Sequence, residues 1–208
     1  MKTYWESRYQ AEGKMWGDAP SRTAFHALEL FSTAGVKTIL VPGSGYGRNT
    51  RLLSESGFEV TGVEISATAY ALALKFDTQS SFYNTSILDL SFLAEKYDAV
   101  YCHSVLHLFR EQDRKTFIRQ CADRLTANGL MFFSVMSEKD PGCGKGTETE
   151  KNTFESKPGR PAHYFSESDL KAHFKGMTVL ETGIMEEPEN HGAEGPHVHP
   201  WRYIYVRI

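Results

Sequence analysis

Glycines at alternate positions mark a turn early in the chain. The motif V-P-G-S-G-Y-G at 41–47 follows the apolar run 38–41 and precedes a segment that favours helix. Glycines let a ligand approach the backbone N–H groups at the start of a helix, where a carboxylate or phosphate is stabilised. The G-x-G-x-G spacing differs from the G-x-G-x-x-G of dinucleotide sites. The motif predicts a ligand site, although a purely structural turn would use the same residues.

Two carboxylates follow this turn at the ends of predicted strands. Glu64 closes the second apolar run, where a carboxylate can accept both hydroxyls of a ribose. Asp89 follows the third run and can accept a hydrogen bond from an adenine amino group, with Ile87 and Leu88 packing nearby. Each also has a plain structural interpretation, because acidic residues are common at strand ends and as caps of helices or turns.

A histidine-containing segment follows the fourth apolar run, 97–102. Open α/β sheets bind ligands beyond the carboxyl ends of their strands, so His103 and Ser104 are expected to border a cleft. His103 or His107 can act as a general base. This role is optional, because a nucleophile can attack a strong electrophile without the help of a base. The alternative for His107 is packing against the next helix.

The remaining candidate ligands lie in polar segments. His197 and His199 share a face if their segment is extended, and could bind a metal with His191 or Glu194. No cysteine pair accompanies them, so we predict a polar loop at a rim or surface and no metal. Cys143 could meet a metalloid substrate, although a lone loop cysteine is more often incidental.

Alternating strands and helices must position these groups. Such an alternation predicts a parallel sheet covered on both faces, and two late strands without a helix between them predict an antiparallel finish. The segments 137–161 and 186–200 are polar and lack periodicity, so we predict connections there. The predicted strands are 38–41, 58–65, 82–84, 97–102, 130–136, 177–184 and 201–208, and the helices are 21–34, 48–56, 66–76, 113–125 and 166–174.

Composition limits the class of protein. The 208 residues, 40% of them hydrophobic, suit one domain spanning 1–208. The net charge of −3 has both signs interleaved, which disfavours nucleic acid as a partner. The three cysteines form no C-x-x-C pair, the opening does not resemble a signal peptide, and there is no long apolar run. These features predict a soluble cytoplasmic protein without a membrane partner. No heptad or long apolar edge demands a partner, so we expect a monomer or weak homodimer.

The turn and the two carboxylates, in this order, resemble the class I S-adenosylmethionine methyltransferase family. The resemblance implies a Rossmann-like three-layer α/β sandwich with a mostly parallel seven-stranded sheet and one antiparallel strand near the C-terminus. It implies S-adenosyl-L-methionine as cofactor, S-adenosyl-L-homocysteine as product and in-line transfer to a small-molecule acceptor. Pro42 stands where the family more often has an acidic residue. The implied cofactor residues are Gly43, Ser44, Gly45, Gly47, Glu64, Ile65, Ser66, Ile87, Leu88, Asp89, His103 and Ser104.

The start of the chain is similar to one branch of that family. The motif Y-W-E-S-R-Y at 4–9, with Trp16-Gly17 and Pro20-Ser21, is similar to the N-terminal segment of the tellurite-resistance and thiopurine methyltransferases. The likeness implies a helical lid over 1–34 that places Trp5, Tyr9 and Trp16 on the cofactor, and a substrate-side loop at 137–165. Closing a site in this way excludes water and aligns reactants. The same aromatic residues could simply pack in the core.

Two other functions use similar features. A nicotinamide-dependent oxidoreductase also pairs glycines with an acidic strand end, but the glycine spacing, Asp89 and the lack of a Tyr-x-x-x-Lys pair after the fourth strand disfavour it. A non-catalytic cofactor-binding protein would share every cofactor feature, so only product formation separates it from an enzyme.

Overall fold

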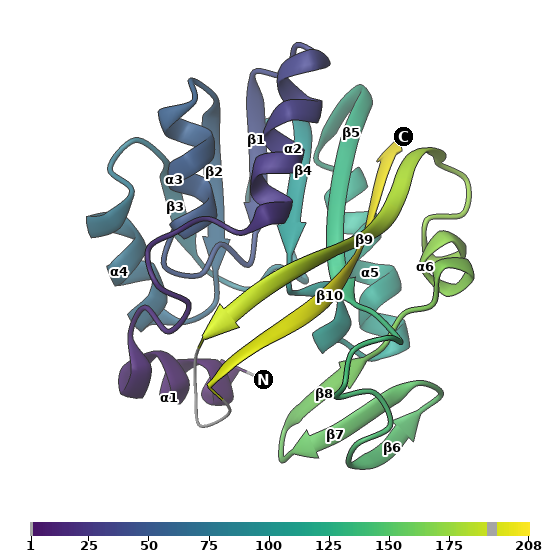
Figure 1. Cartoon of the computed structure of the whole chain (residues 1–208). Coiled ribbons are helices and arrows are strands. Elements are labelled where there is room, and N and C mark those ends of the chain that lie inside the picture. Colours follow the sequence, from purple (N-terminus) through teal and green to yellow (C-terminus); the bar gives the residue numbers. More distant parts are fainter. Residues whose placement is uncertain (1, 191–194) are drawn as a thin grey trace.

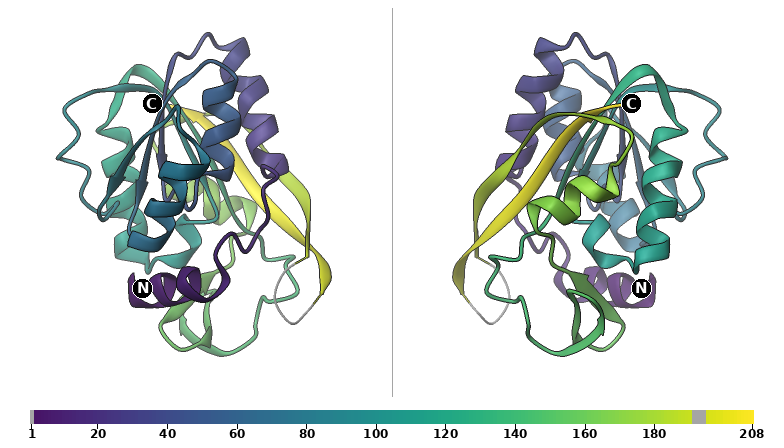
Figure 2. Two further views of the ribbon diagram at one scale, coloured as in Figure 1. Left: turned by 90° about the vertical axis from the view of Figure 1, so that its left-hand side faces the viewer. Right: turned by 90° about the vertical axis from the view of Figure 1, so that its right-hand side faces the viewer.

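The computed structural model describes residues 2–190 and 195–208. Within them, the larger of two sheets has seven strands in the order β3-β2-β1-β4-β5-β10-β9. Helices cover both of its faces, so the arrangement has three layers (Figure 1, Figure 2). The strands are β1 (Thr38–Pro42), β2 (Glu59–Glu64), β3 (Ser81–Asn84), β4 (Tyr97–His103), β5 (Leu125–Met136), β9 (Thr178–Asn190) and β10 (Pro196–Arg207).

One of these seven strands runs against the others. β1 pairs in parallel with β2 and β4, β2 with β3, and β4 with β5. β10 is antiparallel to both β5 and β9, so β9 has the direction of the parallel set. This confirms the predicted mostly parallel, Rossmann-like sheet with one antiparallel strand near the C-terminus. β1 and β4 are buried along most of their length, which explains their continuous apolar runs.

Serine caps begin three of the helices. Ser21, Ser66 and Ser166 each accept a hydrogen bond from a backbone N–H of the following helical turn. Their helices begin where these residues predicted. No helix within residues 2–190 and 195–208 combines the length and apolar character needed to cross a membrane. The helices of the three layers are α2 (Arg22–Thr33), α3 (Arg48–Glu55), α4 (Ala67–Phe76), α5 (Glu111–Ala122) and α6 (Glu167–His173), with a 3₁₀ turn η1 (Leu106–Leu108) before α5.

The segment 1–34, for which a lid was predicted, divides into two parts. α2 packs on the main sheet, with Ala24, Ala27 and Phe31 fully buried. It therefore belongs to the helical layer, and this half of the predicted lid is wrong. α1 (Lys2–Glu12) instead lies beyond the carboxyl ends of the parallel strands and contacts α4 (Figure 1). The lid interpretation is thus restricted to α1 and the residues up to Pro20.

The segment 137–165 contains a second sheet, where the sequence suggested only a loop. Strands β6 (Thr147–Glu150), β7 (Thr153–Lys157) and β8 (Arg160–His163) pair antiparallel. These strands are short and polar because one face is exposed, and this conceals them from hydrophobic periodicity. The sheet lies at the same edge of the molecule as α1 (Figure 1).

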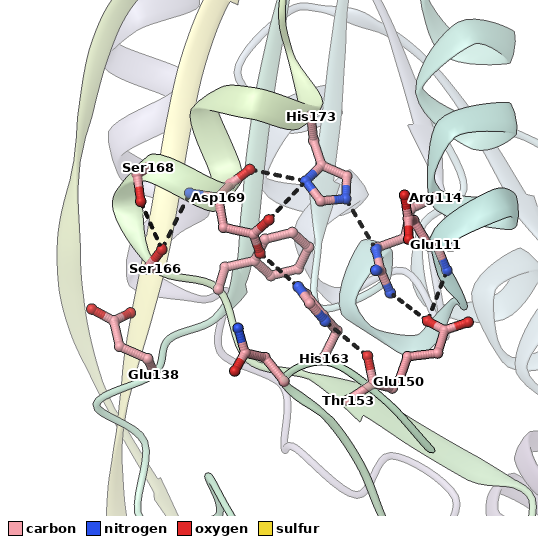
Figure 3. A network of polar contacts seen from close by, with 12 residues as sticks. Glu111, Arg114, Glu138, Glu150, Thr153, His163, Ser166, Ser168, Asp169 and His173 are labelled. Carbon is pink, nitrogen blue, oxygen red and sulfur yellow. Dashed lines mark hydrogen bonds and ion pairs between the residues drawn. The ribbon is translucent and has the colours of Figure 1, made fainter. Parts of the chain in front are cut away.

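A polar network fixes this small sheet to α5 and α6 (Figure 3). His163 of β8 contacts Thr153 Oγ1 at 2.8 Å through Nδ1 and Asp169 at 2.7 Å through Nε2. Arg114 of α5 lies 3.6 Å from Glu150 of β6. Since Arg114 and His163 are almost fully buried, these contacts hold the small sheet in one position.

The last two strands continue beyond the edge of the sheet. The sequence predicted a polar connection over 186–200, but β9 extends to Asn190 and β10 starts at Pro196. The residues of this extension are mostly polar and pair in antiparallel register. The apolar periodicity that indicates strands in the sequence ends before it. The hairpin reaches past the carboxyl ends of the parallel strands to the level of α1 (Figure 1, Figure 2).

Candidate functional site

A cavity of about 250 Å³ opens at the carboxyl ends of β1, β2 and β4. Its wall combines the glycine turn, the ends of these strands, α1 and one residue of the C-terminal hairpin. Of the predicted site residues, those in the wall are Trp5, Tyr9, Trp16, Gly43, Ser44, Gly45, Glu64, Ile65, Ile87, Leu88, His103 and Ser104. The other predicted residues, Gly47, Ser66, Asp89 and His107, do not line it.

The glycine turn approaches neighbouring groups too closely for any side chain. A Cβ at Gly43 would lie 2.4 Å from Val105 Cγ2, and one at Gly45 would lie 3.0 Å from Tyr9 Oη. Both residues also have a positive φ, 73° and 58° respectively, which glycine adopts without strain. The amides of Gly43 and Ser44 donate to Val63 O, which ties the turn to β2. The cavity wall is therefore bare backbone at this point.

Glu64 ends β2 with a carboxylate that is only 6% exposed. Its Oε2 accepts from Gly45 N at 2.9 Å, and its Oε1 accepts from Ser66 N at 2.8 Å. Burial nevertheless raises the pKa of Glu64, against the effect of these amides. An ionised carboxylate has about four acceptor positions. The acceptor capacity that the backbone amides leave would suit hydroxyl donors of a ligand in the cavity.

A serine hydroxyl is unsatisfied in the same wall. Ser44 Oγ is buried and has no hydrogen-bond partner within residues 2–190 and 195–208. A buried polar atom left unpaired costs about 1–3 kcal/mol, so such atoms usually mark a position that a ligand or water fills. Ser44 and Glu64 both line the cavity, which therefore suits a polar ligand.

Asp89 does not reach the cavity. Its side chain is exposed and Oδ1 accepts from Ser91 N at 3.0 Å; hydrogen bonds from the Ser91 hydroxyl and then from its amide lower the pKa of Asp89. Ser86, Ile87 and Leu88 line the cavity instead. After β3 ends, the chain turns at these three residues, and Asp89 points outward. The predicted adenine contact of Asp89 is not supported by its position.

Gly47 and Ser66 support the site from behind. Gly47 is the N-cap of α3, where a φ of 90° again suits glycine. Ser66 caps α4 and donates its hydroxyl to Glu6 at 2.7 Å. Both residues therefore position wall elements without facing the cavity.

α1 and the segment that follows it line one side of the cavity with aromatic rings. The rings of Trp5, Tyr9 and Trp16 lie 6.2–6.3 Å apart, and Trp16 stacks on Tyr46 of the glycine turn at 6.3 Å. These rings both pack together and form cavity wall, so the two interpretations of them do not exclude each other.

Glu6 fixes α1 to the start of α4. It accepts from Ser66 Oγ at 2.7 Å and from Thr68 Oγ1 at 2.6 Å. The hydrogen bond from the Thr68 hydroxyl, followed by that from Ser66, lowers the pKa of Glu6 to about 2. A carboxylate is also favourable at a helix N-terminus. The carboxylate is thus charged at neutral pH and holds α1 against the start of α4.

His103 is the histidine that faces the cavity. Its Nδ1 lies 2.7 Å from Ser134 Oγ and 3.0 Å from Thr23 Oγ1, and its ring is 4.8 Å from that of Trp201. Burial lowers the pKa of His103 well below 6.5, so the ring is neutral at pH 7. Because Nδ1 is occupied by hydroxyl groups, Nε2 is the atom that can exchange a proton with a ligand. The next residue, Ser104, has a φ of 62°, a conformation that is strained for serine.

His107 and Cys143 are placed away from this chemistry. His107 lies in η1, is only 1% exposed and packs 5.6 Å from the ring of Trp201. A general base must reach a substrate proton, so the proposed base role of His107 is not supported. Cys143 does not line the cavity, and burial raises its pKa, which disfavours a reactive thiolate. His191 and Glu194, named as metal ligands from the sequence, lie outside the described residues.

Several wall residues were not predicted from the sequence. Arg48 and Asn49 follow the glycine turn directly, so their place at the start of α3 was a usable signal. No local sequence pattern indicates Glu189 or Asp113. The full set of unpredicted wall residues is Tyr46, Arg48, Asn49, Ser86, Val105, Leu108, Phe109, Asp113 and Glu189.

Comparison with known proteins agrees with this geometry. Residues 40–133, which include the glycine turn, Glu64 and His103, match the family model described as a methyltransferase domain. These residues are therefore similar to the methyltransferase domain family. A putative methyltransferase of Geobacillus sp. strain WCH70 is 30% identical over 140 residues, 64% of this chain and 56% of that protein. The chain spans about half the length of the curated relatives it matches.

Solved structures share the fold across the whole chain. A Burkholderia thailandensis 1,6-didemethyltoxoflavin-N1-methyltransferase, solved with 1,6-didemethyltoxoflavin and S-adenosylhomocysteine bound, aligns with a TM-score of 0.73 at 19% identity, covering 99% of this chain and 86% of that one. TehB from Haemophilus influenzae aligns with a TM-score of 0.69 at 18% identity, covering 98% and 66%. These likenesses show that the chain shares the fold of these structures.

Proposed function

We propose that this protein is an S-adenosylmethionine-dependent methyltransferase that acts on a small-molecule acceptor. The observation that carries the proposal is the polar wall of the cavity, where Ser44 and Glu64 line the same space as the bare glycine turn. The matched methyltransferase domain contains all three. When bound, the cofactor supplies a methyl group on a positively charged sulfur.

The cofactor residues follow from their positions in the wall. Gly43, Ser44 and Gly45 face the amino-acid end through backbone and hydroxyl groups, and Glu64 accepts the two ribose hydroxyls. Ser86, Ile87 and Leu88 form the surface for the adenine, in place of Asp89. Trp5, Tyr9 and Trp16 exclude water from the opposite side.

The acceptor approaches from the side of His103. In the transfer, the carbon–sulfur bond breaks, its electron pair stays on sulfur, and the acceptor atom forms a new bond to the methyl carbon. An acceptor that carries a proton releases it, and neutral His103 receives it at Nε2. Val105, Leu108 and Phe109 give this half of the wall an apolar surface, which suits a small partly apolar molecule.

The finer setting of the protein is also part of this proposal. Interleaved charges with a net value of −3 support a small-molecule substrate rather than a nucleic acid. The three cysteines are free thiols, as in reducing compartments, which supports a cytoplasmic location. We take residues 1–208 to act as one domain and as a monomer or weak homodimer.

A methyl-acceptor screen tests the proposal. The full chain is incubated with S-adenosylmethionine and panels of thiols, small amines and metalloid oxyanions, and S-adenosylhomocysteine is measured by chromatography. Formation that depends on one acceptor class is expected. Binding of S-adenosylmethionine without product from any acceptor would favour a non-catalytic binding protein, and binding of NADH in its place would favour an oxidoreductase.

A further inference from the structure

The β9–β10 hairpin carries three metal-binding side chains on one face, called the hairpin cluster below. Glu189 lies directly opposite His197 in the antiparallel register, and His199 is the next residue on the same face of β10. One donor atom from each of these residues falls within 4.8 Å of the others. Bonds from zinc to imidazole nitrogen or carboxylate oxygen are about 2.0–2.2 Å long, so small side-chain rotations bring the three donors around one ion.

Hydrogen bonds set the tautomer of both histidines in the hairpin cluster. His197 Nδ1 lies 2.7 Å from Gly195 O, and His199 Nδ1 lies 2.5 Å from a carboxylate oxygen of Asp140. A carbonyl oxygen can only accept, and an ionised carboxylate likewise, so each Nδ1 carries the proton. The lone pair of each ring therefore resides on Nε2. Metal-binding histidines are usually held in this way, by a carboxylate or a backbone carbonyl on the other nitrogen.

Charge favours a cation at the same place. Glu189 contributes one carboxylate, and Asp140, whose side chain is 5% exposed, contributes a second behind His199. Glu189 also lines the cavity, so such an ion would lie at the cavity wall.

In a second histidine–carboxylate group, protein side chains and backbone contact the histidine rings (Figure 3). His163 uses both ring nitrogens, on Thr153 and Asp169. His173 contacts Asp169 O through Nδ1 at 2.9 Å, and its Nε2 accepts from Arg114 Nε at 3.1 Å. Both rings are thus engaged in protein contacts, and the Arg114 guanidinium already supplies the positive charge. This group is structural.

We infer that Glu189, His197 and His199 bind one divalent transition-metal ion at the wall of the cavity. Two histidines and one glutamate form a set that zinc uses when one position stays open to water or a ligand. Affinity for such nitrogen and oxygen donors rises along the first-row series towards copper, so cobalt and zinc are both suitable probes. The inference goes beyond the proposed methyl transfer and does not depend on it. It also replaces the sequence-based expectation of a polar loop without metal.

Titration of the untagged full chain with Co²⁺, after removal of metal with a chelator, tests the inference. One equivalent should bind with visible ligand-field absorption, and Zn²⁺ should displace it. His199→Ala should weaken binding at least ~100-fold, since it removes a ligand, and Asp140→Asn should weaken it about 10–100-fold, because the carboxylate orients that ligand. No S-adenosylmethionine is present, so the result is separate from that of the acceptor screen.

His26→Ala is the matched control. His26 of α2 contacts Glu181 at 2.7 Å; Glu181 lies on β9, as Glu189 does, but this histidine–glutamate pair is outside the cavity wall. It should bind Co²⁺ as the unchanged protein does. Glu189→Gln, which keeps the size of the side chain, provides a second ligand variant if His199→Ala fails to fold. Absence of stoichiometric binding, or equal affinity in Glu189→Gln and the unchanged protein, would overturn the inference.

Discussion

The two halves of the cavity wall are assembled differently. Under the proposed function, the cofactor half comes from one continuous segment, from β1 to the turn after β3, in which the glycine turn and Glu64 are joined by direct hydrogen bonds. The acceptor half brings together the end of β4 and the hairpin, which are far apart in sequence. A continuous segment can keep one geometry in many proteins, whereas a wall of separate elements can change one element at a time. The difference explains how one fold can use a common methyl donor with different acceptors.

The largest effect is expected at the glycine turn. Gly43→Ala should weaken S-adenosylhomocysteine binding more than ~100-fold, about 2.7 kcal/mol, because the new Cβ would lie 2.4 Å from Val105 Cγ2. Gly35→Ala is the control, since Gly35 also has a positive φ, 72°, but open space around its Cβ position. Calorimetric titration of both variants, with melting temperatures, separates steric overlap from backbone strain. Equal S-adenosylhomocysteine affinities in the two variants would show that the glycine turn is not part of the binding site.

The next effect concerns the acceptor half. His103→Gln should slow turnover about 100-fold with an acceptor that must lose a proton, while S-adenosylhomocysteine affinity changes little. His107→Gln is the matched change, because His107 packs on Trp201 as His103 does but lies outside the cavity wall. Its turnover per folded molecule should be unchanged. Steady-state rates with both variants decide the point, and an equal loss in both would indicate a structural role for His103.

The lid should have a smaller effect. Glu6→Ala removes the contacts with Ser66 and Thr68, so α1 should close less often. We expect an up to about fivefold weaker S-adenosylhomocysteine affinity and a changed tryptophan emission from Trp5 and Trp16. Glu12→Ala serves as the control, because Glu12 accepts a hydrogen bond from Arg8 of the same helix. A lid that is irrelevant to binding would leave both variants with unchanged affinity.

The smallest effect is on stability. Burial holds the pKa of His103 and of His107 well below 6.5, so the folded state binds fewer protons than the unfolded state when the pH is below that value. The free energy of unfolding contributed by these rings is therefore fully present above pH 6.5 and falls as the pH drops below it. Urea unfolding at several pH values between 5 and 8 measures the slope. His107→Gln should reduce that slope, and an unchanged slope would mean that neither ring is held neutral.

The sequence predicted the cofactor half better than the acceptor half, for physical reasons. Serine caps and the glycine turn depend on neighbouring residues only, so Ser21, Ser66 and Ser166 indicated helix starts correctly. The sheet β6–β8 and the hairpin extension were missed because their strands are polar and half-exposed, which removes the apolar signal. Their side chains find partners through tertiary packing.

Single positions illustrate the same limit. Asp89 was predicted to contact the adenine because of its carboxylate, but the turn after β3 places Ser86 in the cavity wall and leaves Asp89 exposed. Glu189 enters the wall only because the hairpin continues past the sheet. Residue type indicated the chemistry that a position can do, while its direction depended on the folded chain.

The most direct test of the account is a calorimetric titration of the full chain with S-adenosylhomocysteine, beside Glu64→Ala. The account predicts one binding site in the unchanged protein. It predicts an affinity in Glu64→Ala that is weaker by about 1.5–3 kcal/mol, the scale of hydrogen bonds to a charged group. Binding of NADH with no binding of S-adenosylhomocysteine, or the same S-adenosylhomocysteine affinity in Glu64→Ala and the unchanged protein, would contradict it.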